Sequence, residues 1–115
     1  PAIKDVSVRL YLEIDPAYLP EAVRAAVRAA LHGDREGAPG LFTFTGRALG
    51  QPAFLSEIYA AITAIAGVSF VEVTRFDLGV ETAARMLDAI PAAPGEWLRL
   101  SPQHLELASA AEATP

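Results

Sequence analysis

The stretch that decides the fold is VSVRLYLEI, residues 6–14, in which apolar and polar residues alternate without a break. Its even-numbered positions hold only Val, Leu or Ile, and its odd-numbered positions hold Ser, Arg, Tyr and Glu. A period of two predicts a strand with one face buried and the other exposed. Asp15-Pro16 follows directly and ends the strand, because proline cannot continue a ladder and restricts the residue before it.

Two helices are expected after this strand. Pro20 suits a first helical turn, where its missing N–H is not needed, and Gly33 ends the first helix. Its apolar stripe has helical spacing and consists of Leu19, Val23, Ala26, Val27, Ala30 and Leu31. Pro52 opens the second helix, and Gly67 is its expected C-cap. Ser56 is an N-cap or first-turn residue, and the apolar face consists of Leu55, Ile58, Ile62 and Ile65.

The rest of the chain predicts further strands. Residues 68–76 are rich in β-formers, and placing Val71 and Val73 in the core puts the alternate residues on the opposite face. Residues 97–100 and 105–107 are short strand candidates joined by the turn-like Ser101-Pro102-Gln103. Residues 41–45 are β-prone, and residues 81–89 have helical composition.

This order of elements predicts an α+β fold. We expect a two-layer sandwich, with a small antiparallel or mixed sheet and two helices on one face, in a ferredoxin-like or split βαβ arrangement. Residues 1–107 form a single domain in this interpretation, and residues 108–115 a flexible tail. A chain that starts at Pro1 with a strand is expected to be a piece of a longer protein.

Composition narrows the function classes. The 115 residues carry a net charge of -5, which argues against nucleic acid or an anionic membrane as a partner, because both require a positive field. There is no cysteine, so disulfides, thiolate metal sites and a cysteine nucleophile are excluded. Neither a membrane span nor a signal peptide is visible.

No motif for catalysis emerges. His32 is at the end of a predicted helix, where the helix dipole favours a histidine. His104 and Glu106 share a strand face but lack a third metal ligand. The loop 46–50 lacks the lysine and hydroxyl residue of a P-loop. No serine lies in a Gly-x-Ser-x-Gly elbow. We therefore expect no catalytic, cofactor-binding or metal-binding residue, and no enzyme.

The second face of the sheet is the feature that stands out. If both helices cover one face, the other presents the aromatic residues Tyr11, Phe70 and Phe76 beside Arg9 and Thr74. This composition is typical of a protein–protein interface. The alternative is that the C-terminal segment, with Met86, Leu87 and Trp97, folds back over the aromatic residues.

One stretch resembles a known family. Residues 50–59, GQPAFLSEIY, are followed by IAGV at 65–68 and VEVTRF at 71–76. This pattern resembles the C-terminal region of baseplate J-like proteins, the baseplate assembly (wedge) proteins of contractile phage tails and related injection systems. The similarity covers about residues 6–76. The residues that carry it are Gly50, Pro52, Ser56, Ile58, Tyr59, Gly67, Val68, Val71, Val73 and Phe76.

The resemblance implies a structural part without catalytic residues or cofactors. Its partners would be other baseplate wedge proteins, and no nucleic acid, membrane or small-molecule substrate is implied. It would be assembled in the bacterial cytoplasm and then form part of a phage or phage-tail-like particle. The alternative is a ferredoxin-like regulatory domain that binds a small molecule at the loop 46–52.

Overall fold

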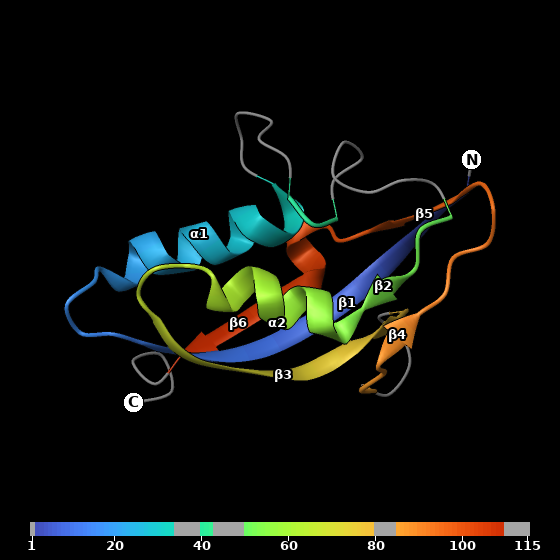
Figure 1. Ribbon diagram of the computed structural model, residues 1–115. Helices are drawn as coiled ribbons and strands as arrows, with labels where there is room; N and C mark the ends of the chain where they lie inside the picture. The colour runs from blue at the N-terminus through green and yellow to red at the C-terminus, as the bar shows by residue number, and fades with distance from the viewer. Residues whose placement is uncertain (1, 34–39, 43–49, 80–84, 110–115) are drawn as a thin grey trace.

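The central strand of the protein is β1 (Ala2–Ile14), as the alternating stretch predicts. The computed structural model describes residues 2–33, 40–42, 50–79 and 85–109. β1 pairs antiparallel with β3 (Val68–Leu78) along one edge. Along its other edge it pairs in parallel with β5 (Glu96–Arg99) and then with β6 (Leu105–Ser109). The main sheet is therefore mixed, with β1 in its middle (Figure 1).

Two helices lie on one face of this sheet. They are α1 (Pro20–His32) and α2 (Leu55–Thr63), which contact each other side by side (Figure 1). A second, two-stranded sheet joins β2 (Ala53–Phe54) to β4 (Ala89–Ile90). This confirms the expected two-layer α+β arrangement.

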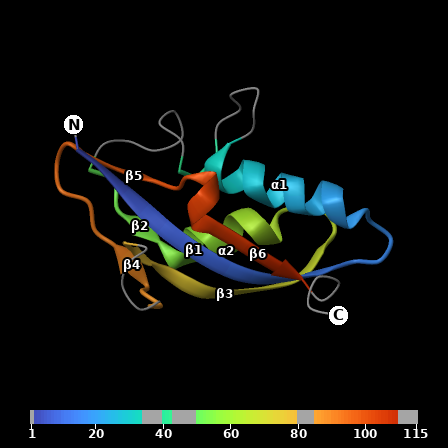
Figure 2. The ribbon, with the colours of Figure 1, turned by 180° about the vertical axis from the view of Figure 1, so that it is seen from behind.

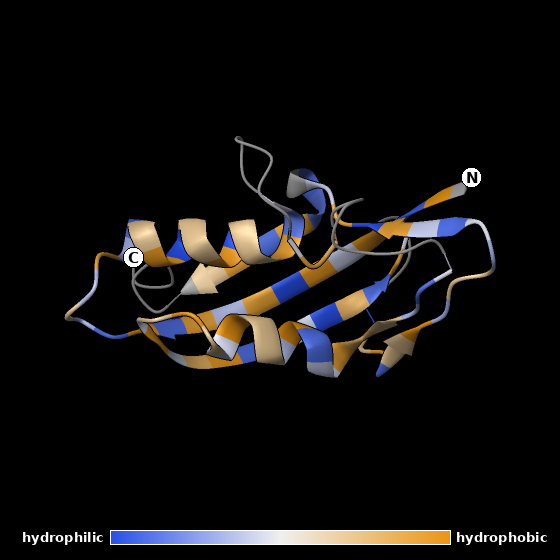
Figure 3. Ribbon diagram, turned by 45° about the horizontal axis from the view of Figure 1, so that its top comes forward, coloured by the Kyte–Doolittle hydropathy of each residue, from blue (hydrophilic) through white to orange (hydrophobic). Residues whose placement is uncertain are grey.

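The core lies between the helices and the sheet, and Figure 3 shows hydrophobic residues on these elements. The even-numbered residues of β1 from Val6 to Leu12 are almost completely buried. They pack in one cluster with buried residues of both helices, which are Val27, Leu31, Ile58 and Ile62. Leu19 was expected in this stripe but is 75% exposed, because it is the N-cap residue and precedes the first helical turn.

The order of strands differs from a ferredoxin-like sheet. A split βαβ unit has a strand between its two parallel strands, whereas β1 pairs directly with the parallel β5 and β6. A short 3₁₀ helix, η1 (Pro102–His104), separates β5 from β6. The two strands therefore follow one edge of β1 in the same direction, end to end.

A bulge changes the face on which Phe76 lies. β1 and β3 are in register from Val6↔Leu78 to Arg9↔Arg75, but the next pair is Leu10↔Val73, which leaves Thr74 as an extra residue. An extra residue reverses the alternation of side chains beyond it. Phe76 is consequently 0% exposed in the core, and its expected position on the open side of the sheet was wrong.

The helix ends confirm some expectations and correct others. Pro20 is in the first turn of α1, and Gly33 with φ 82° ends the helix. Ser56 lies in the first turn of α2, one of its two expected positions; the N-cap residue is Phe54, whose N–H donates to Glu57 Oε1 at 2.8 Å. α2 ends at Thr63 with Ala64 as C-cap, so Gly67 forms the turn into β3 instead of the cap.

The less regular segments also differ from expectation. Leu41 and Phe42 form a turn on the end of α1, where their N–H groups donate to the carbonyls of Ala30 and Leu31. Residues 43–45 lie outside the described residues, as do residues 81–84 of the expected helix. The remainder of that segment is not helical, since Met86 forms a parallel bridge with Phe76. β6 continues through Ser109, so the expected tail boundary at 107/108 was too early.

Candidate interaction surface

The face of the main sheet opposite the helices is the candidate functional surface (Figure 2). In this view α1 and α2 lie behind the sheet. We call it the open face and define it by residues of three adjacent strands. They are Arg9, Tyr11 and Glu13 of β1, Phe70, Glu72 and Thr74 of β3, and Glu106 and Ala108 of β6.

Two aromatic rings are next to each other on the open face. Tyr11 and Phe70 have ring centroids 6.4 Å apart and planes inclined by 63°, an edge-to-face contact. Phe70 remains 47% exposed, and Tyr11 is half-buried. The expectation that Tyr11 and Phe70 share one face of the sheet is therefore met, and Met86 and Leu87 of the C-terminal segment pair with the Phe76 backbone instead.

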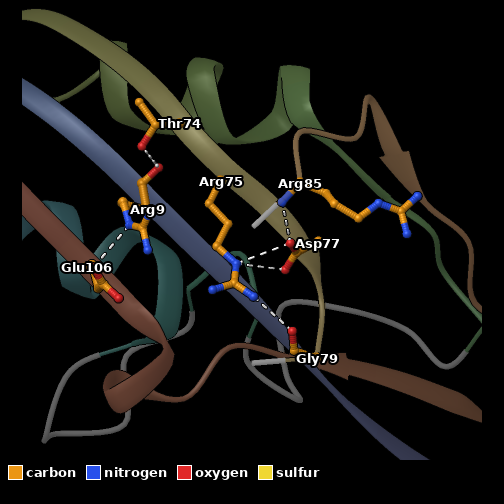
Figure 4. Close-up of polar contacts among 7 residues, drawn as sticks. All are labelled: Arg9, Thr74, Arg75, Asp77, Gly79, Arg85 and Glu106. Atoms are coloured by element: carbon orange, nitrogen blue, oxygen red, sulfur yellow. Dashed lines mark hydrogen bonds and ion pairs between the residues drawn. The ribbon is translucent and has the colours of Figure 1, made fainter. Parts of the chain in front are cut away.

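Arg9 and Thr74 also lie on this face. Arg9 Nε donates to Glu106 Oε2 at 3.1 Å, and the Thr74 hydroxyl donates to the Arg9 carbonyl at 3.3 Å (Figure 4). Both contacts are exposed. The Arg9–Glu106 pair links β1 to β6 and neutralises both charges.

The other end of the same side of the sheet is closed by a buried ion pair that the sequence interpretation missed. Arg75 Nε lies 3.0 Å from Asp77 Oδ1 and 3.2 Å from Oδ2, and Asp77 is 1% exposed. Arg75 Nη2 donates to the Gly79 carbonyl, and the Arg85 N–H donates to Asp77 Oδ2 (Figure 4). An acid and a base two residues apart on a strand share a face, and that spacing was the signal available in the sequence.

The first strand and β5 carry two further ion pairs. Asp5 Oδ1 lies 2.8 Å from Arg99 Nη2, and Lys4 Nζ lies 3.0 Å from Glu96 Oε2. The hydrogen bond from the Ala93 N–H, followed by that from Lys4, lowers the pKa of the Glu96 carboxyl below its ordinary value. These contacts attach β5 to the beginning of β1.

The two histidines occupy separate places. His32 Nδ1 lies 2.9 Å from the Gly33 carbonyl at the end of α1, in agreement with its expected role at a helix terminus. His104 ends η1, so it is not on a strand with Glu106, which pairs with Arg9. Across residues 2–33, 40–42, 50–79 and 85–109, no three His, Asp or Glu side chains come together as a metal site would require.

Two other expectations concern the ligand loop of the alternative function and membrane spans. The loop 46–52, the ligand site of the alternative function, lies outside the described residues apart from residues 50–52. Within the described part of the chain, neither helix has the length and apolar character needed to cross a membrane.

No protein-family profile matches the sequence, and none of the curated proteins compared with it is significantly similar.

Proposed function

We propose that this chain is a structural assembly module of a baseplate wedge subunit, in a contractile phage tail or a related injection system. It would act through protein–protein contacts and without catalysis. The observation that carries the proposal is the open face, where an aromatic pair lies exposed among charged side chains. Exposed aromatic residues of this kind are enriched at the centres of protein interfaces.

The residues of the motif at 50–76 support the proposal because their positions are those of a folding pattern. The Gly50 N–H donates to the Glu96 carbonyl at 2.7 Å, and Gly50 has φ 74°, which favours glycine. Ile58 and Val73 are core residues. The Tyr59 hydroxyl accepts a hydrogen bond from the Val73 N–H at 2.9 Å, beside the bulge. These residues determine the local fold, which is the role expected of motif residues in a structural protein.

The proposal includes a place and partners. Other baseplate wedge proteins would cover the open face during assembly in the bacterial cytoplasm, and the chain would remain in the finished phage or phage-tail-like particle. The acidic net charge of -5 supports a protein partner over nucleic acid or an anionic membrane.

Co-expression tests the proposal. The parent protein that contains this chain would be co-expressed with the wedge proteins encoded beside it, and complexes would be measured by size-exclusion chromatography with light scattering. Tyr11→Asp or Phe70→Asp should weaken the complex by about tenfold or more, as expected for an interface centre. Both variants should remain folded, since these side chains are outside the core.

Leu19→Asp is the matched control. It exchanges a more exposed apolar residue for the same charge at the start of α1, on the helix side of the sheet. It should leave the complex intact. The proposal would be abandoned if no complex with any neighbouring wedge protein formed, or if Leu19→Asp weakened the complex as much as Phe70→Asp. Genes for sheath, tube and spike proteins beside this one would be the expected genomic context.

A further inference from the structure

Four side chains at one end of the open face form an alternating square. β1 and β3 place Tyr11 opposite Glu72 and Glu13 opposite Phe70. Directly paired residues on one face of antiparallel strands have Cβ atoms roughly 5 Å apart. Each aromatic ring therefore has a carboxylate directly across from it, and the two rings touch on the diagonal. We call this group the aromatic–acidic quartet.

The two carboxylates of the quartet carry charge that the described part of the chain does not neutralise. Both Glu13 and Glu72 are exposed, and neither forms an ion pair or hydrogen bond with another described residue. The nearby Arg9 is engaged with Glu106. The quartet thus combines exposed aromatic surface with two unpaired negative charges.

We propose that the quartet receives an arginine side chain from the partner protein. A guanidinium group is planar, stacks on aromatic rings and directs paired N–H donors at carboxylates, so it complements both halves of the quartet. A lysine ammonium would satisfy the charge but would not stack in the same way. This inference rests on the proposed function, because it specifies the chemistry of the wedge surface that meets the open face.

A direct binding measurement tests the arginine specificity. The ¹⁵N-labelled chain would be titrated with N-acetyl-L-arginine amide and, separately, with N-acetyl-L-lysine amide. We expect amide shifts to change at residues 11–13 and 70–72, with arginine binding at least about threefold more tightly than lysine. Equal affinities, or shifts dispersed over the other surfaces, would overturn the inference.

Charge-neutral variants test the carboxylates. Glu13→Gln with Glu72→Gln should weaken binding of the arginine probe by about two- to fivefold for each carboxylate removed, as for exposed ion pairs. The control is Glu21→Gln with Asp88→Asn, which changes the net charge equally at exposed positions outside the open face and should leave probe binding unchanged. Equal losses in the two double variants would reduce the effect to net charge and overturn the inference.

The inference and the proposed function fail in different ways. If a wedge complex forms and depends on Phe70 but not on Glu13 and Glu72, the arginine contact is wrong and the assembly function stands. If the probe binds the quartet but no wedge complex forms, the assembly function is wrong and the guanidinium site stands. Concentration-dependent self-association lost in Phe70→Asp would identify a second copy as the occupant and overturn the assignment to a different partner.

Discussion

At the scale of single residues, the side of the sheet on which an aromatic side chain lies determines what its removal does. Phe76 is completely buried, whereas Phe70 is 47% exposed, although they are only six residues apart on β3. We expect Phe76→Ala to lower the free energy of unfolding by about 3–5 kcal/mol, as for other buried phenylalanines. Phe70→Ala should lower it by at most about 1.5 kcal/mol, mainly through the lost contact with Tyr11. Urea denaturation of both variants measures the difference, and equal losses would contradict the bulge.

Position 67 requires glycine for two reasons: its backbone conformation and the closeness of neighbouring side chains. It has φ 97°, and a Cβ there would lie 2.7 Å from Val23 Cγ2 and 2.9 Å from Tyr18 Cγ. Gly67→Ala should therefore destabilise the protein both through the left-handed backbone and through overpacking. Gly95→Ala is the control, since Gly95 has φ 83° but no atom within 4 Å of the added Cβ. Thermal unfolding should show Gly67→Ala less stable than the control by about 1–3 kcal/mol.

At the scale of elements, α1 begins without a side-chain cap. Leu19 occupies the N-cap position with extended backbone, and its side chain makes no capping hydrogen bond. Leu19→Asp should stabilise the protein by about 0.5–1 kcal/mol, because aspartate accepts a hydrogen bond from the first turn and its charge favours the helix N-terminus. Leu19→Ala should give no such gain. A shift in the urea midpoint with an unchanged slope would measure the effect, and a lower midpoint for Leu19→Asp would contradict it.

The elements also show how far the sequence determines the fold. The alternation in β1 and the helical spacing of Val23, Val27 and Leu31 predict those elements, because each pattern reports which side is buried. The pattern of β3 did not reveal the bulge at Thr74, since a bulge depends on the register with another strand. Regular alternation along β3 therefore assigned Phe70, which precedes the bulge, to the correct face of the sheet. It assigned Phe76, which follows the bulge, to the wrong face. The bulge also places Arg75 and Asp77 on the side opposite the helices, whereas the spacing of two residues that lets them pair was visible in the sequence.

At the scale of the whole molecule, the sheet has one side covered by helices and the other divided between an exposed end and a closed end. The exposed end carries the aromatic–acidic quartet, and the closed end carries the ion pair of Arg75 and Asp77. The pair also bonds to Gly79 and Arg85, so it fixes both sides of the connection that follows β3. Beside it, the Phe76 N–H donates to the Arg85 carbonyl, and the Leu87 N–H donates to the Phe76 carbonyl. Under the proposed function, we expect a wedge partner to contact the exposed end, because described residues close the other end.

The closed end gives the last prediction. Asp77→Ala removes one partner of a pair whose side chains are 11% and 2% exposed, which leaves the Arg75 guanidinium poorly compensated. We expect a loss of about 3 kcal/mol in the free energy of unfolding, together with faster hydrogen exchange at the Arg85 and Leu87 amides. Asp5→Ala is the control, because the Asp5–Arg99 pair is 38% and 40% exposed and should cost no more than about 1 kcal/mol. If the two variants lost equal stability, the burial of Asp77 would carry no energetic weight, and the connection after β3 would be held by its apolar contacts instead.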